Sequence, residues 1–150
     1  MMPREFGAII GGLYHAALFS LQEKITELVG REGLRDYVFP MVQESMMNVK
    51  KLGIEPIKGG NLDEALSEFL QLLEKSFLLA HFERKDEDTY LFVVDDCIMA
   101  KRAHTVTQPK GTCPAAMVAA AIIQKHSGRE VTIEWSKLTE KGSVTEIKIA

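Results

Sequence analysis

The hydrophobic pattern of this 150-residue chain changes its period near residue 76. Before that point apolar residues recur at steps of three and four, which is the spacing of a helix with one buried side. After it, short runs of strand-forming residues alternate with charged turns, which is the pattern of hairpins. The change predicts an α+β fold in which N-terminal helices pack on a mostly antiparallel sheet of about four strands, with one inserted helix. We expect a single domain over residues 1–150, with a helical part at 1–75 and a sheet-plus-helix part at 76–150.

Three helices are predicted in the helical part, over about residues 4–29, 34–52 and 62–75. Gly30 should end the first helix. Pro40 lies inside the second helix and should kink or restart it, because proline lacks the N–H that an interior helical residue donates. Asn61 and Glu64 form a capping pattern at the start of the third helix.

Two hairpins with a helix between them are predicted in the second part. The strands FLLAHFERK and TYLFVVDD flank the turn DED, and the strands EVTIEW and VTEIKI flank SKLTEKGS. Between the hairpins, Pro114 should open a helix and Gly128 should close it. Five of the first eight residues of this inserted helix are alanine, so it can lie close against a sheet.

The composition argues against two classes of partner. The chain has 18 basic and 21 acidic residues, whereas nucleic-acid-binding domains usually carry a basic surface, so we expect no direct nucleic acid partner. The most apolar stretch, residues 6–21, is shorter than the roughly 20 residues of a spanning helix, so we expect no membrane span. Seven methionines and two cysteines, without a cleavable leader, favour a reducing cytoplasm.

The segment DDCIMAKRAHTVTQPKGTCPAAMV contains both cysteines of the chain. Cys113 should lie at the N-cap of the helix that begins at Pro114, where backbone N–H groups and the helix dipole lower the pKa of a thiol. A zinc ion could be held by Cys97, Cys113 and His104, although two separated cysteines need further ligands to complete four-coordination. Three interpretations stay open: core packing, a zinc or redox site, and a thiolate nucleophile.

The motifs of the second part resemble a known family. A strand ending in DDC, the segment GTCPAAMVAAAII, the strand GREVTIEW and the closing LTEKGSVTEIKI are similar to the 4-vinyl reductase domain, also described as a hydrocarbon-binding domain. That family shares a broad fold group with the small TRAPP vesicle-tethering subunits and the haem-nitric-oxide sensors. The resemblance covers about residues 76–150. It implies helices over an antiparallel sheet around an apolar cavity, in a sensor or carrier that is often dimeric.

The resemblance also bears on zinc and on a ligand pocket. In several family members a cysteine at the position of Cys113 joins later cysteines in a zinc site, whereas here Thr145 or Glu146 stands where the family has cysteine. The implied pocket lies between the alanine-rich helix, the second helix and the strands. Its expected lining residues are Met41, Met46, Met47, Phe82, Tyr90, Phe92, Ala119 and Ala120. Methionine beside aromatic rings suits a pocket that adapts to an apolar guest.

Three functions are compatible with these features. The first is a stand-alone cytoplasmic binding domain for a hydrophobic small molecule, which serves as a sensor, carrier or accessory factor and acts through a partner regulatory protein. The second is a homodimeric interaction or assembly protein without a ligand, joined through the first helix near Gly7, Ala8 and Gly11. The third is an enzyme that uses the thiolate of Cys113 on a tetrapyrrole-like ring.

Overall fold

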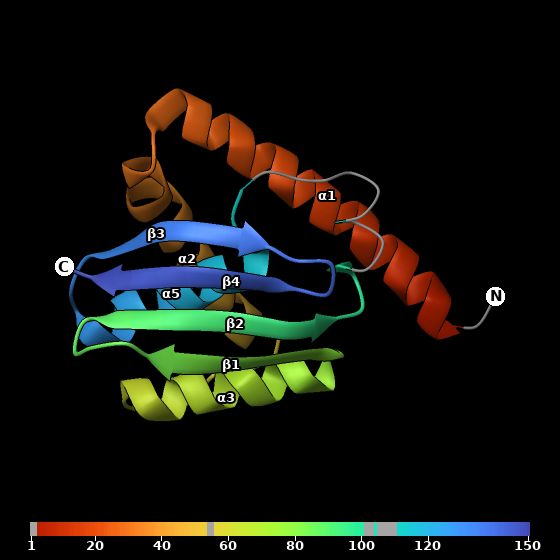
Figure 1. Ribbon diagram of the computed structural model, residues 1–150. Coiled ribbons are helices and arrows are strands. Elements are labelled where there is room, and N and C mark those ends of the chain that lie inside the picture. The colour runs from red at the N-terminus through yellow and green to blue at the C-terminus, as the bar shows by residue number, and fades with distance from the viewer. Residues whose placement is uncertain (1–2, 54–55, 101–103, 105–110) are drawn as a thin grey trace.

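The computed structural model describes residues 3–53, 56–100, 104 and 111–150, but not the side chains of residues 3–8 and of Met46. Helices pack on one face of a four-stranded antiparallel sheet, which confirms the predicted α+β class (Figure 1). The other face of the sheet, turned toward the viewer in Figure 1, is not covered by any helix of the described residues.

Two hairpins build the sheet. The strands are β1 (Leu78–Arg84), β2 (Thr89–Cys97), β3 (Val131–Leu138) and β4 (Ser143–Ile149), and their order across the sheet is β1-β2-β4-β3. Neighbouring strands are antiparallel, as predicted. The second turn is shorter than expected, because β3 and β4 continue into the SKLTEKGS segment. Thr139 and Gly142 close this turn with two hydrogen bonds of 2.9 Å.

The helices begin and end close to the predicted positions. They are α1 (Pro3–Val29), a π-helical segment (Leu34–Val38) that continues into α2 (Phe39–Lys51), α3 (Leu62–Lys75) and α5 (Pro114–Ser127). Pro40 lies in the first turn of α2, at the point where the π-helical segment changes to α-helix, which agrees with the predicted kink or restart. Asn61 Oδ1 accepts a 2.9 Å hydrogen bond from the N–H of Glu64 and caps α3. Gly128 ends α5 with φ 67°, which glycine adopts without strain.

The core lies between the sheet and the helices α3 and α5. Phe92 of β2 is fully buried and pairs in register with Phe82 of β1. The ring of Phe69 in α3 lies 6.0 Å from that of Phe92. The buried residues of α5 are Ala116, Met117, Ala119, Ala120, Ala121, Ile122 and Ile123. Because many of them are alanines, the backbone of α5 can approach its neighbours closely.

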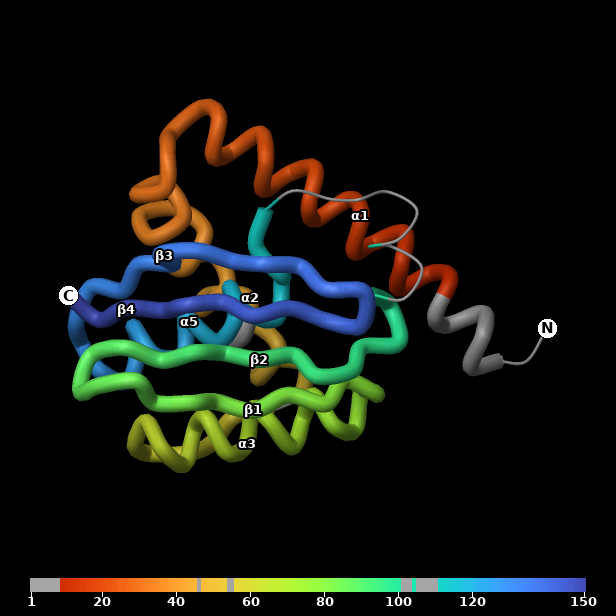
Figure 2. Tube along the Cα trace, viewed as in Figure 1, coloured from red at the N-terminus to blue at the C-terminus, as the bar shows by residue number. Residues whose placement is uncertain are grey.

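α1 runs along the β3 side of the molecule (Figure 2). Buried polar groups hold it there. The side-chain amide of Gln22 donates a 2.6 Å hydrogen bond to the carbonyl of Thr112 and accepts one of 2.6 Å from its N–H. Gly111 permits this approach, because its φ is 123° and a Cβ there would lie 3.2 Å from Oε1 of Gln22. The segment GTCP therefore both holds α1 and starts α5.

Within the residues that the structure describes, no helix combines the length and the apolar character that crossing a membrane requires.

Candidate functional site

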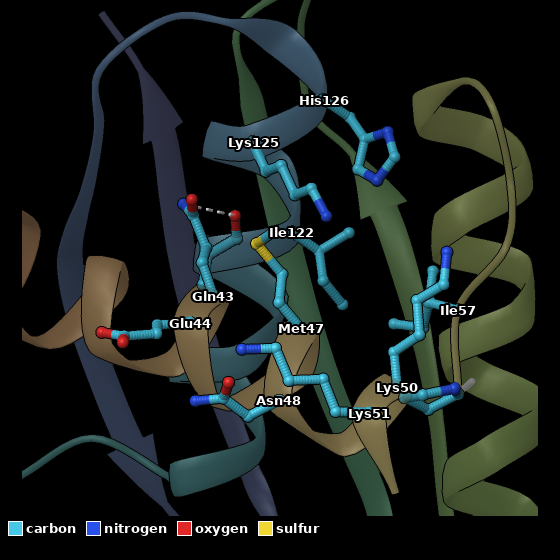
Figure 3. A pocket seen from close by; sticks show the side chains of 12 residues that line it. Gln43, Glu44, Met47, Asn48, Lys50, Lys51, Ile57, Ile122, Lys125 and His126 are labelled. Carbon is cyan, nitrogen blue, oxygen red and sulfur yellow. Dashed lines mark hydrogen bonds between the residues drawn. The ribbon is translucent and has the colours of Figure 1, made fainter. Parts of the chain in front are cut away.

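A pocket of about 670 Å³ lies between α2, α5 and the segment that connects α2 to α3 (Figure 3). The described residues that line it are Gln43, Glu44, Met47, Asn48, Lys50 and Lys51 from α2, Pro56 and Ile57 from the connection, and Ala121, Ile122, Lys125 and His126 from α5. Helical packing therefore positions most of this lining, and the connection closes one side.

The pocket has an apolar floor. Ala121 and Ile122 of α5 are buried, and Met47 and Ile57 complete the apolar surface. Gln43 donates a hydrogen bond of 3.4 Å from Nε2 to the carbonyl of Ala121, which ties α2 to α5 beside the floor. A surface of this kind can bury the carbon atoms of a small molecule.

Basic side chains border this floor. Lys50 and Lys51 lie in the last turn of α2, and Lys125 and His126 lie in the last turn of α5, where the negative end of the helix dipole favours cations. Figure 3 shows the α5 pair on one side of Ile122 and Met47 and the two α2 lysines on the other. Burial lowers the pKa of His126 and Lys125 lowers it further, so this imidazole is neutral at pH 7.

The methionines of α2 do not lie as predicted. Met41 and Met47 are 62% and 61% exposed, so the prediction that they face the sheet is wrong. α2 instead turns Phe39 and Val42 toward the hydrophobic core. Met47 does line the pocket, whereas Met41 is not among the described lining residues. The side chain of Met46 lies outside the described part of the structure.

The other predicted lining residues belong to the core. The ring of Phe82 lies 4.9 Å from that of Phe92 and 6.4 Å from that of Tyr90. Ala119 and Ala120 have no exposed surface. None of these five is among the described residues that line the pocket. The observed pocket therefore shares Met47 with the predicted one and otherwise lies at a different place on α2 and α5.

Cys113 is the N-cap of α5, as predicted, but the pKa of its thiol is raised rather than lowered. Burial raises the pKa of Cys113, and this desolvation outweighs the hydrogen bonds with the backbone of Ala115 and Ala116, which favour the thiolate. Burial likewise raises the pKa of Cys97. Both cysteines are free thiols inside the core.

His104 contacts α1 through a buried histidine pair. Its Nδ1 lies 2.7 Å from the carbonyl oxygen of Thr139, and its Nε2 lies 3.3 Å from Nε2 of His15. Because a carbonyl only accepts, Nδ1 of His104 carries a proton and donates to Thr139. When Nε2 of His104 carries no proton, it accepts a hydrogen bond from the Nε2–H of His15. In the described part of the chain, no three His, Cys, Asp or Glu side chains are placed to hold a metal ion, so the predicted zinc site has no geometric support there.

Comparisons with protein-family models, with curated proteins and with solved structures find no match for this chain. The resemblance to the 4-vinyl reductase domain therefore stays a prediction that rests on the motifs of residues 76–150. Function has to be inferred from the geometry of the pocket.

Sequence reasoning missed the basic residues of the pocket. Lys51, Lys125 and His126 lie at helix ends, where basic residues are common, so their shared location could not be recognised from their positions in the chain. The available signal was that two separately predicted helices both end in a basic pair.

Proposed function

We propose that this chain is a binding domain for a small molecule with an apolar body, which occupies the pocket between α2 and α5. The observation that carries the proposal is a volume of about 670 Å³ beside the apolar floor of Met47, Ile57, Ala121 and Ile122. Small-molecule sites typically have volumes of roughly 300–1,000 Å³ and combine apolar surface with a few polar groups. A cytoplasmic location and a partner protein that responds to the bound ligand belong to the same proposal.

An uncharged dye, N-phenyl-1-naphthylamine, tests this function because its fluorescence rises in apolar surroundings. We expect saturable binding by the parent protein. Met47→Trp should weaken binding strongly, because the larger ring enters the pocket from an exposed position of α2. Met41→Trp is the matched control, since Met41 is equally exposed on the same helix but outside the described lining. No binding by the parent, or equal binding by both variants, would contradict the proposal.

The burial of Cys113 favours binding over catalysis. An enzyme that uses this thiol would need a thiolate that the substrate can reach. Cys113 is 5% exposed and burial raises the pKa of its thiol, so the described geometry meets neither requirement.

Homodimerisation through α1 is a second candidate, favoured by the exposed side of that helix. Large apolar side chains recur along it at helical spacing: Leu13 is 64% exposed, Tyr14 70%, Leu18 48%, Leu21 60% and Leu28 81%. We propose that this α1 stripe is covered by the same stripe of a second copy, since monomers rarely expose contiguous apolar patches. Gly11 faces the body of its own chain instead, because a Cβ there would lie 2.9 Å from Sδ of Met99.

Light scattering after gel filtration tests the dimer. The parent should have twice the monomer mass, and the double variant Leu13→Glu/Leu21→Glu should be a monomer, because charges on the α1 stripe oppose its burial. Leu52→Glu is the control, since Leu52 is 78% exposed at the end of α2, away from the stripe. A monomeric parent at high micromolar concentration would count against this second function.

A further inference from the structure

We infer that the ligand of the pocket carries a negatively charged group, such as a carboxylate, sulfate or phosphate, joined to its apolar body. The inference rests on the proposed function, because it names the class of molecule that the same pocket takes. An uncharged hydrocarbon would use the apolar floor alone and would leave the basic side chains beside it without a role in binding.

The charge of the pocket is opposite to that of the chain. Besides Lys50, which already has an interaction partner, the described lining contains two lysines, Lys51 and Lys125, and one acidic residue, Glu44, whereas the whole chain has a formal charge of -3. In Figure 3 the carboxylate of Glu44 points away from Lys125. A concave surface with an excess of positive charge attracts anions and raises their local concentration. The pocket is therefore suited to an anion in spite of the acidic composition.

Helix-end electrostatics explain each lysine separately but not their common location. A cation in the last turn stabilises α2 or α5 whether or not the two helix ends share a pocket. Here the last turns of both helices border one apolar floor, which brings Lys51 and Lys125 from positions 74 residues apart in the sequence to one site. His126 adds a neutral imidazole, which can donate a hydrogen bond to an anion without further charge.

Two dyes that differ in one charged group separate this inference from the proposed function. 8-Anilinonaphthalene-1-sulfonate has the ring system of N-phenyl-1-naphthylamine and an added sulfonate. We expect the parent to bind the sulfonate dye more tightly than the neutral dye at low salt, and the preference to shrink as salt screens the lysines. Lys125→Gln and Lys51→Gln should each weaken the sulfonate dye by about two- to fivefold, and each should weaken the sulfonate dye more than the neutral dye.

Lys137→Gln is the matched control, because Lys137 is an exposed lysine of β3 that does not line the pocket. It should leave the affinities for both dyes unchanged. Near-UV circular dichroism must show native packing in every variant, since the sulfonate dye also binds partly folded chains.

The outcomes distinguish the two proposals. Weaker binding of both dyes by Met47→Trp supports the proposed function. If in that case the parent binds the two dyes equally, or neither Lys51→Gln nor Lys125→Gln weakens binding of the sulfonate dye, the inference is overturned and the proposed function stands. If neither dye binds in a way that depends on Met47, both are overturned. Tighter binding of the sulfonate dye that is lost in the two pocket-lysine variants but not in Lys137→Gln supports both.

Discussion

The helices α1 and α5 are both rich in apolar residues, but different interactions hold them in place. α5 lies within the core, where Ala120 and Ile123 have no exposed surface. α1 buries Phe19 beside the polar side chain of Gln22, while Leu28 stays 81% exposed. Apolar content alone therefore does not determine where a helix lies. α5 has neighbours around most of its circumference, whereas one side of α1 has none within the described chain.

This difference makes the two helices sensitive to different changes. Burial of apolar surface is non-directional, and a close-packed interior responds to the volume of each side chain. Hydrogen bonds between buried groups depend on the donor, the acceptor and their protonation. We therefore expect changes of volume to act mainly on α5, and changes of charge or hydrogen bonding to act mainly on α1.

Ala120→Phe in α5 should cause the largest loss, about 3 kcal/mol in the free energy of unfolding, because a ring must enter a fully buried site. The matched change Ala17→Phe on the exposed side of α1 should change stability by less than about 0.5 kcal/mol when it is made in the Leu13→Glu/Leu21→Glu variant, in which a proposed dimer contact cannot bury it. Urea unfolding followed by circular dichroism measures both values. A well-tolerated Ala120→Phe would indicate a cavity beside α5 within the core, as the family resemblance implies, and would break the contrast.

A decrease of pH from 7 to 5 should destabilise α1 and leave the amides of α5 protected from hydrogen exchange. Burial and the neighbouring His104 lower the pKa of His15 from 6.5 to about 4, so the unfolded chain binds this proton more readily than the folded one. The stabilisation from a neutral His15 is complete above pH 6.5 and is lost as the pH falls toward 4, with a loss of about 2 kcal/mol at pH 5. Hydrogen exchange, corrected for intrinsic rates, should show α1 amides exchanging faster at pH 5.

His15→Gln provides the control for this pH effect, since glutamine can still donate to Nε2 of His104 but does not titrate. Between pH 7 and pH 5 the parent should lose about 2 kcal/mol more of its free energy of unfolding than His15→Gln does. His81 and His126 titrate in both proteins, so their contributions cancel in the comparison. The same pH dependence in both proteins would show that another group is responsible.

Local signals explain why most of the fold could be predicted. The cap at Asn61, the restart at Pro40 and the stop at Gly128 depend on residues within one helical turn, so each appears in the sequence as it does in the structure. The direction in which Met41 points could not be predicted, because α2 offers apolar residues on several sides and its neighbours decide which are buried. The pKa of Cys113 could not be predicted for the same reason. The local sequence places this residue at the helix start, but segments distant in sequence bury it and so raise the pKa of its thiol.

The candidate site was harder to predict than the fold for the same reason. The sequence predicts Met47 as a lining residue, but it predicts a pocket that the strands of the sheet also line. The described lining comes from α2, α5 and the connection at Ile57. Hydrophobic periodicity identifies the buried side of one helix and carries no information on which two helix ends meet. The pocket depends on that meeting, so it needed the tertiary structure.

Gln22→Ala should destabilise α1 by about 1–2 kcal/mol, because it leaves the N–H and carbonyl of Thr112 without their buried partner. Gln71→Ala, at an exposed position of α3, is the control and should change stability by less than about 0.5 kcal/mol. Hydrogen exchange should show faster exchange in α1 and at residue 112, with α5 unchanged. Equal loss of protection in α1 and α5 would mean that the two helices unfold together.

Gly11→Ala should have the smallest effect and reports how closely α1 lies against Met99. Alanine is about 1 kcal/mol better than glycine inside a helix. At Gly12 a Cβ would meet nothing within 4 Å in the described chain, so Gly12→Ala should gain that full amount. At Gly11 a Cβ would lie 2.9 Å from Sδ and 3.1 Å from Cγ of Met99. The flexible methionine can move aside, but lost packing offsets much of the gain.

We therefore expect Gly11→Ala to change the free energy of unfolding by less than about 0.5 kcal/mol, and Gly12→Ala to raise it by about 1 kcal/mol. Urea unfolding under the same conditions gives the free energy of unfolding of each variant. The gain in helix propensity is the same in both and cancels in their difference, so the difference reports the contact with Met99. Equal stabilisation by both would mean that α1 lies farther from Met99 than described. The attachment of α1 would then depend mainly on the hydrogen bonds of His15 and Gln22. The pH effect would stay at about 2 kcal/mol at pH 5, because the pKa values of His15 in the folded and unfolded chain determine it.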